Sequence, residues 1–260
     1  MCFAAWLQRP LRWPFAFLEK NNLRTAVYID GFNLYYAALK GTPYKWLDIA
    51  AFCRAVLPDN ADICQIKYFT AKVSNRAPGD NKAGKQSIYL KALRTQAPEL
   101  QVVFGHFSVH ANLARMVTPG GELDQKDIVS RDRRISGINR QIFNERKQWK
   151  RDPGPPVHTI KTEEKGSDVN LAVHMVNDAW SKDLDCFAVI SNDSDLAEAM
   201  RIVKCEREKK VALIAMPGRR VAHKLKQHST FVRSAKRINL ERNQLPSPIP
   251  GTKYYKPLDW

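Results

Sequence analysis

At residues 188–196 the chain reads AVISNDSDL, and this stretch decides the fold. An apolar run stops at a polar turn that carries two carboxylates, Asp193 and Asp195. The helical spacing of Leu196 and Met200 follows directly. These features predict a buried strand, a tight turn and the start of a helix. Because ligands of open parallel sheets bind beyond the carboxyl ends of the strands, we expect both aspartates to lie at a binding site.

Two other stretches have the same layout. Residues 27–33 read VYIDGFN and end a strand on Asp30, while residues 158–168 read HTIKTEEKGSD and end on Asp168. Each aspartate alone is better explained as a helix cap than as a metal ligand, and Asp195 in particular lies at an expected N-cap position. Three acidic junctions at one edge of a sheet, however, form the pattern that a divalent cation requires, because Mg²⁺ and Mn²⁺ favour carboxylate oxygens.

The composition is strongly basic. The chain has 260 residues, 44% of them hydrophobic, and a formal net charge of +16. Such an excess favours a polyanion, usually nucleic acid, or an anionic membrane surface. No apolar stretch reaches the roughly 18 to 20 residues of a membrane span. The five cysteines form no CxxC pair, which indicates reduced core thiols in a cytoplasmic protein rather than a zinc site.

Strand and helix patterns alternate along the chain. This alternation predicts an α/β fold with a parallel sheet that helices cover on both faces. The expected strands are 25–30, 62–71, 101–105, 157–162, 186–191 and 210–215. The expected helices are 34–39, 47–57, 86–97, 168–181, 195–208 and 219–227, with a loop at 74–85.

The same alternation of strands and helices indicates the domain organisation. We expect a peripheral extension at 1–24, one domain at 25–235 with a basic insertion at about 106–156, and a Pro-rich tail at 236–260. The last part of that tail, 246–260, is expected to lie on the surface.

Three motifs in order carry a resemblance to a known family. They are YIDGFN at 28–33, EKGSDV at 164–169 and SNDSDL at 191–196, and they resemble the NYN domain family, the LabA-like members of the PIN-like nuclease superfamily. The resemblance implies a Rossmann-like three-layer α/β/α fold with a central, mostly parallel sheet. It also implies a nuclease that depends on Mg²⁺ or Mn²⁺ and usually acts on RNA. By position, the metal-binding and catalytic acids would be Asp30, Asp168, Asp193 and Asp195, with Asn33 as a catalytic polar residue beside the first acid.

One position departs from the family pattern. The second motif of the family often continues to another Asp six residues after the first, and this chain has His174 there. Asp178 follows one helical turn later and could partly take the place of that acid, because residues four apart share a helix face. His174 is either a helix residue packed near the core or a contact to substrate or metal.

The basic segments fit a nucleic-acid substrate, with RNA favoured over DNA. Residues 201–242 hold thirteen Lys/Arg and three Asp/Glu. Contacts of such residues with phosphates provide affinity but little sequence selectivity. The expected substrate-binding residues are Lys72, Arg76, Lys165, Ser191 and Ser194, and the aromatic residues that could stack on bases are Tyr36, Phe143 and Trp149.

The function that the sequence supports best is a metal-dependent endoribonuclease. Two alternatives from other classes stay open. The first is a non-catalytic RNA- or DNA-binding module, which His174 in place of an acid would favour. The second is a toxin-like or regulatory component that acts with a partner through its terminal segments. A homodimer is compatible with all three.

Overall fold

A computed structural model describes residues 22–75, 79–115, 156–258 and 260 of the chain. The chain divides into two compact units, one formed by residues 1–106 with 166–260 and the other by residues 107–165. The expected extension 1–24 and insertion 106–156 fall mostly outside the described residues, as do Arg76, Phe143 and Trp149.

The architecture is built on a mostly parallel sheet, which confirms the predicted α/β class. Its seven strands are arranged in the order β4-β3-β2-β1-β5-β6-β7. They are β1 (Leu23–Asp30), β2 (Ala61–Ala71), β3 (Leu100–Arg115), β4 (Pro156–Lys165), β5 (Cys186–Ile190), β6 (Lys210–Ala215) and β7 (Phe231–Ser234). Strand β1 pairs in parallel with both β2 and β5. The strand order changes direction between β1 and β5, and ligands of such sheets bind at that point.

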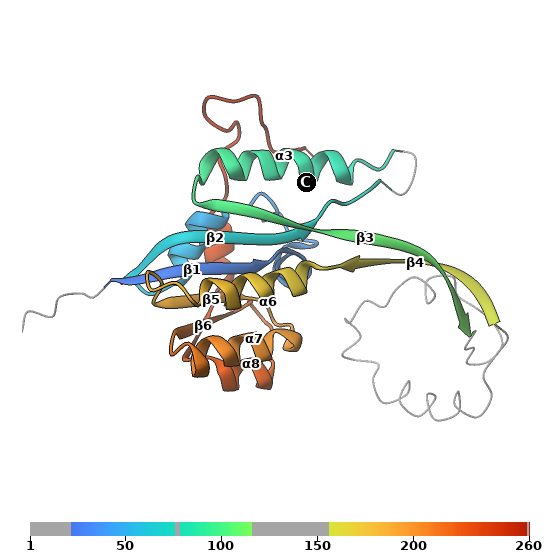
Figure 1. The fold of residues 1–260 in the computed structure, drawn as a ribbon. Coiled ribbons are helices and arrows are strands. Elements are labelled where there is room, and N and C mark those ends of the chain that lie inside the picture. Colours follow the sequence, from blue (N-terminus) through green and yellow to red (C-terminus); the bar gives the residue numbers. More distant parts are fainter. Residues whose placement is uncertain (1–21, 76–78, 116–155, 259) are drawn as a thin grey trace, which may run out of the picture. The chain divides into compact units, whose positions relative to one another are not determined.

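Helices pack on both faces of this sheet within the first unit. They are α1 (Gly31–Leu34), α2 (Ile49–Val56), α3 (Lys82–Gln96), α6 (Ser167–Asp178), α7 (Ala197–Arg201), α8 (His223–His228) and α9 (Arg237–Arg242). Three short helical turns extend two of these helices. Helix α1 is followed by η1 (Tyr35–Leu39), and α7 lies between η2 (Ser194–Leu196) and η3 (Ile202–Glu206). Figure 1 shows α3 on one side of the sheet and α6, α7 and α8 on the other.

The period of β1 explains this arrangement, because successive side chains of a strand point to opposite faces. Val27 and Ile29 are buried in the cluster that includes residues of α2 and α3. Ala26 and Tyr28 are buried in the cluster that includes residues of α6, α7 and α8. The unbroken apolar run at residues 26–29 of β1 is therefore explained by burial on both faces.

Most of the expected elements are present, and their ends differ. Helix α3 begins at Lys82, inside the expected loop, and α8 begins at His223 rather than at residue 219. Strand β7 and helix α9 were not expected. The first turn of α3 carries no buried apolar residue, so hydrophobic period alone could not find it.

Part of the C-terminal segment packs against the core rather than lying on the surface, although Tyr255 and Leu258 are exposed. Ile249 is fully buried. The Trp46 indole N–H donates to the carbonyl oxygen of Pro246 at 3.1 Å. The rings of Trp46 and Trp260 lie 5.9 Å apart, edge to face. These contacts join residues 200 or more positions apart, which local patterns do not reveal.

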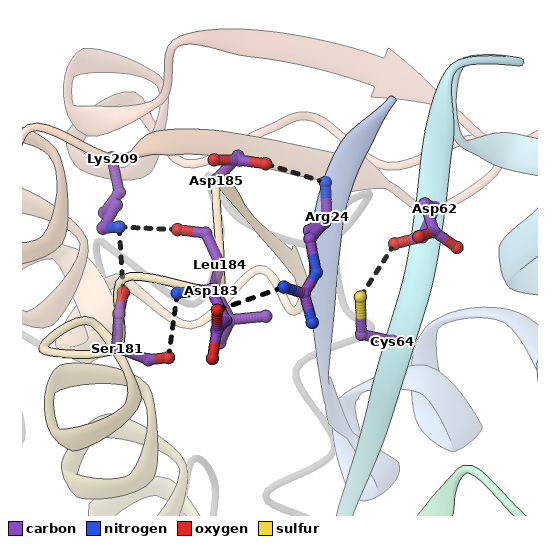
Figure 2. A network of polar contacts seen from close by, with 8 residues as sticks. All are labelled: Arg24, Asp62, Cys64, Ser181, Asp183, Leu184, Asp185 and Lys209. Atoms are coloured by element: carbon purple, nitrogen blue, oxygen red, sulfur yellow. Dashed lines mark hydrogen bonds and ion pairs between the residues drawn. The ribbon is translucent and has the colours of Figure 1, made fainter. Parts of the chain in front are cut away.

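At the amino ends of the strands, charged side chains are paired with one another or with the backbone (Figure 2). The Asp185 carboxylate accepts the Arg24 backbone N–H at 3.0 Å, and the Asp183 carboxylate lies 3.2 Å from the Arg24 guanidinium. The Lys209 ammonium donates to the carbonyl oxygen of Ser181 at 2.9 Å. The carboxylates of Asp183 and Asp185 at this edge are thus already paired.

Four cysteines lie among the described residues, and all are free thiols, as expected. Cys53 and Cys186 are buried, whereas Cys64 and Cys205 are exposed, so the expectation of core positions is wrong for the last two. Within the described ranges, no helix has the length and apolar character to cross a membrane.

Candidate active site

The first acid of the site is Asp30, the last residue of β1. Its Oδ1 accepts the backbone N–H of Asn33 at 2.8 Å and caps the first turn of α1. Only 5% of the residue is exposed. The following residue is Gly31, where a Cβ would lie 2.7 Å from the Phe69 carbonyl oxygen. Glycine therefore allows the chain to turn directly against β2 and keeps Asp30 at the end of the sheet.

The third motif arrives at this place from the neighbouring strand, β5. The Ser191 hydroxyl donates to Asp30 Oδ2 at 3.0 Å and accepts the backbone N–H of Asp193 at 3.1 Å. The Asn33 side-chain oxygen accepts the backbone N–H of Asn192 at 3.1 Å. Two motifs that lie about 160 residues apart in sequence are thus joined by direct hydrogen bonds.

The second motif contributes Asp168, in the first turn of α6. The preceding Gly166 has a φ of 89°, a conformation that favours glycine and lets the chain enter the helix. The charge of Asp168 acts on Asp30. The structure therefore brings together acids from all three predicted junctions.

The surroundings of Asp30 disfavour the ionised form of its carboxyl group. The pKa of Asp30 is raised to about 7, chiefly by burial. The negative charges of Asp168 and Asp193 contribute to this rise, and the hydrogen bonds from Asn33 and Ser191 oppose it. None of the described Lys or Arg side chains forms an ion pair with Asp30. A bound cation would favour the ionised carboxylate.

Asp195 differs from the other predicted acids. It is exposed, and its backbone N–H donates to Asp193 Oδ1 at 3.1 Å. Asp193 therefore caps the turn η2, a role that the sequence alone suggested for Asp195. The part of Asp195 in binding a metal stays a prediction.

The predicted cation fits these residues in charge and in donor type. Asp30, Asp168 and Asp193 offer carboxylate oxygens, which Mg²⁺ and Mn²⁺ prefer. Among the described residues, no three His, Cys, Asp or Glu side chains already stand grouped as a metal site. The carboxylates thus interact through charge without forming a ready set of ligands.

The departure at position 174 has a structural explanation. The Lys67 ammonium lies 3.3 Å from His174 Nδ1 and 2.5 Å from the Asp178 carboxylate. The Asp178 carboxylate also accepts the Tyr28 hydroxyl at 2.7 Å and the Gln65 amide at 3.2 Å. Asp178 is therefore bound within a polar network and does not take the place of an acid beside Asp30.

His174 also packs against the core. Its ring meets that of Phe69 edge to face, with centroids 5.6 Å apart. The interpretation of His174 as a packed helix residue is thus supported by its contacts. Burial raises the pKa of Tyr28, and the hydrogen bond to Asp178 raises it further, so the phenol stays protonated as a donor.

The residues predicted to contact the substrate differ in exposure and in their partners. Lys72 is exposed, with its ammonium 5.4 Å from the Phe104 ring centroid. Ser194 is also exposed. The Lys165 ammonium lies 3.0 Å from the Glu163 carboxylate within the second unit. Ser191 is buried, and its hydroxyl is engaged by Asp30 and the backbone of Asp193.

Two residues of this region were missed from the sequence. Asn192 lies inside the third motif, and its position between Ser191 and Asp193 was the available signal. Lys67 is a buried lysine in the largely apolar second half of β2, which signals a buried partner. That partner, Asp178, is 111 residues away and could not be identified from sequence alone.

The comparisons with known proteins agree with the motifs. Residues 110–235 match the NYN domain family. The predicted resemblance is thereby confirmed. The NYN match includes the second and third motifs, and the first motif at 28–33 precedes it. It supports a nuclease-like function and an interaction with nucleic acid.

A relative with an assigned activity is 6-hydroxy-3-succinoylpyridine 3-monooxygenase HspA of Pseudomonas putida (strain DSM 28022 / S16). It is 29% identical over 271 residues, which cover 94% of this chain and 77% of that one. Among solved structures, a protein of unknown function from Vibrio parahaemolyticus is similar, with 13% identity and a TM-score of 0.46. The alignment with it covers 83% of this chain and 94% of the other.

Proposed function

We propose that the protein is a metal-dependent endoribonuclease with a PIN-like three-layer fold. The observation that carries the proposal is Asp30, a buried carboxyl between the charges of Asp168 and Asp193 and without an ion pair among the described residues. Such an arrangement is stabilised by a cation. The NYN match and the net charge of +16 make RNA the preferred partner.

Asp30, Asp168 and Asp193, with Asp195 as a further predicted ligand, would hold Mg²⁺ or Mn²⁺. When bound, this ion supplies the activated water and the charge stabilisation that phosphodiester hydrolysis needs. The rest of the chemistry belongs to the chain. Ser191 and the Asn33 backbone orient the two oxygens of Asp30. The Ser191 hydroxyl also fixes the backbone that carries Asp193.

The test is a cleavage assay on labelled single-stranded RNA and the equivalent DNA, with Mg²⁺, Mn²⁺ or EDTA. We expect cutting of RNA with metal, loss of cutting in EDTA, and loss in Asp193→Asn. The matched control is Asp183→Asn, which removes an exposed carboxylate at the opposite edge of the sheet. Cleavage that survives both Asp30→Asn and Asp193→Asn would disprove the proposal.

A second candidate function is the oxygenation of a hydroxylated pyridine. The observation that favours it is the alignment with HspA over 94% of this chain. A monooxygenase reaction places one oxygen atom of O₂ in the product and reduces the other to water with two electrons from a reductant. Oxygen consumption with 6-hydroxy-3-succinoylpyridine and NADH, absent without the pyridine, would favour this function over the nuclease.

A further inference from the structure

The loop between β6 and α8, residues 216–222, is held against the third motif by one side chain. The Asn192 amide nitrogen donates to the carbonyl oxygen of Arg220 at 2.9 Å. Its amide oxygen accepts the backbone N–H of Ala222 at 2.8 Å. Asn192 is the residue before Asp193, and its own backbone N–H is bonded to Asn33. The loop is therefore fixed to the same frame that positions the acids.

This loop includes the start of a segment whose charged residues are all basic. Residues 219–228 hold four Lys/Arg and no Asp/Glu. Arg219 and Arg220 are both exposed, and within the described part of the chain neither guanidinium forms an ion pair or a hydrogen bond. By contrast, the Arg201 guanidinium is bound by Glu198 and Glu206, each at 2.7 Å. Two arginines next to the acidic site are thus available for an external anion.

We propose that Arg219 and Arg220 bind backbone phosphates of the RNA beside the scissile bond, and that Asn192 is the positioning residue for this loop. The inference rests on the proposed nuclease function. An acidic site repels a polyanion, so a substrate needs cationic contacts close to it. Guanidinium groups suit this task, because their donors match the geometry of phosphate oxygens.

The experiment measures binding without cleavage. Fluorescence anisotropy of a labelled single-stranded RNA is recorded in EDTA over a series of salt concentrations. Two lost phosphate contacts should lower the slope of log K against log salt by about 1.4, at about 0.7 per contact for single strands. We expect Arg219→Ala/Arg220→Ala to weaken binding on the order of tenfold at low salt.

The control is Lys182→Ala/Lys210→Ala, which removes the same charge from exposed residues at the amino edge of the sheet. It should leave the salt slope unchanged. Arg219→Lys/Arg220→Lys should recover the slope, because a phosphate contact needs the charge. Asn192→Ala should lower the slope in part, and an unchanged slope in this variant would count against the positioning role of Asn192.

The outcomes distinguish a failure of the proposed loop contacts from a failure of the proposed nuclease function. Wild-type protein that cuts RNA, with Arg219→Ala/Arg220→Ala binding as tightly and with the same slope, overturns the role of the loop and leaves the nuclease intact. Wild-type protein that neither binds nor cuts RNA overturns both. An equal loss in the lysine control also overturns the inference, because only net charge would then matter.

Discussion

Two poorly exposed aspartates on the α6 side of the sheet have opposite surroundings. Asp178 is bonded to an ammonium, a phenol and an amide, all from strands β1 and β2. Asp30 accepts hydrogen bonds from a backbone N–H and a hydroxyl, and the charges that raise its pKa are those of two other acids, Asp168 and Asp193. Among the described residues, Lys67 thus supplies the positive charge that pairs with Asp178, whereas Asp30 has no such side chain and can pair with a bound cation. This difference separates an acid that stabilises the fold from one that is available for chemistry.

The largest effect should come from exchanging the two acids for amides. Asp30→Asn is expected to lower cleavage by about 10³-fold or more, because the metal loses a ligand and the water its activation. Asp178→Asn is expected to reduce stability and leave the residual activity of the folded fraction close to normal. Cleavage assays and urea unfolding, carried out on both variants, measure these effects. Loss of cleavage in Asp178→Asn with normal cleavage in Asp30→Asn would contradict the assignment of the two acids.

The next effect concerns the counter-charge itself. Lys67→Met should destabilise the protein by about 3 to 5 kcal/mol, because Asp178 would remain buried without a cation. Urea unfolding measures this change. Lys67→Met/Asp178→Leu removes both charges and should recover much of the loss. If the double variant is no more stable than the single one, packing and not charge explains the effect.

A smaller effect is the pH dependence that Asp30 imposes on the metal-free protein. Its pKa is 3.8 when unperturbed and about 7 in the fold. Between these values the folded state keeps a proton that the unfolded state has lost, so stability falls as pH rises and levels off above about 7. The slope is at most about 1.4 kcal/mol per pH unit. Asp30→Asn should lack this contribution in urea unfolding from pH 5 to 8 in EDTA, whereas Asp178→Asn should retain it.

The smallest effect concerns the bond between the motifs. Asn33→Ala removes the acceptor of the Asn192 N–H and should cost about 1 kcal/mol, the usual value of one hydrogen bond. Cleavage should fall on the order of tenfold, because Asp193 is held less well beside Asp30. Thermal unfolding and cleavage kinetics measure the two parts. Asn33→Asp keeps an acceptor and should retain more stability than Asn33→Ala.

The contrast between these acids also marks what the sequence can predict. Asp30 and Asp193 were found because they follow apolar strands, β1 and β5, which are adjacent in the parallel sheet. Asp168 was found from its motif, and it reaches the site in the first turn of α6. The pairing of Lys67 with Asp178 depends on a helix crossing a strand 111 residues away, and no local period encodes such a crossing. The packing of Trp260 against Trp46 was missed for the same reason.

Some errors have a local cause instead. The first turn of α3 reads KAGK and has no buried apolar residue, so its composition resembles that of a loop. Strand β7 has only four residues and helix α9 only six, which is too short for a clear period. The motifs were predictable because they combine strand, turn and charge in a fixed order.

The hydrogen bonds from Asn192 to Asn33 and from Ser191 to Asp30 join parts of the chain that are synthesised at different times. A ribosome releases the chain from its N-terminus, so Asp30 emerges long before its companions. A nascent chain that stops short of residue 193 has neither the hydroxyl nor the second carboxylate that complete the site. The candidate site is therefore incomplete until at least residue 193 has been synthesised.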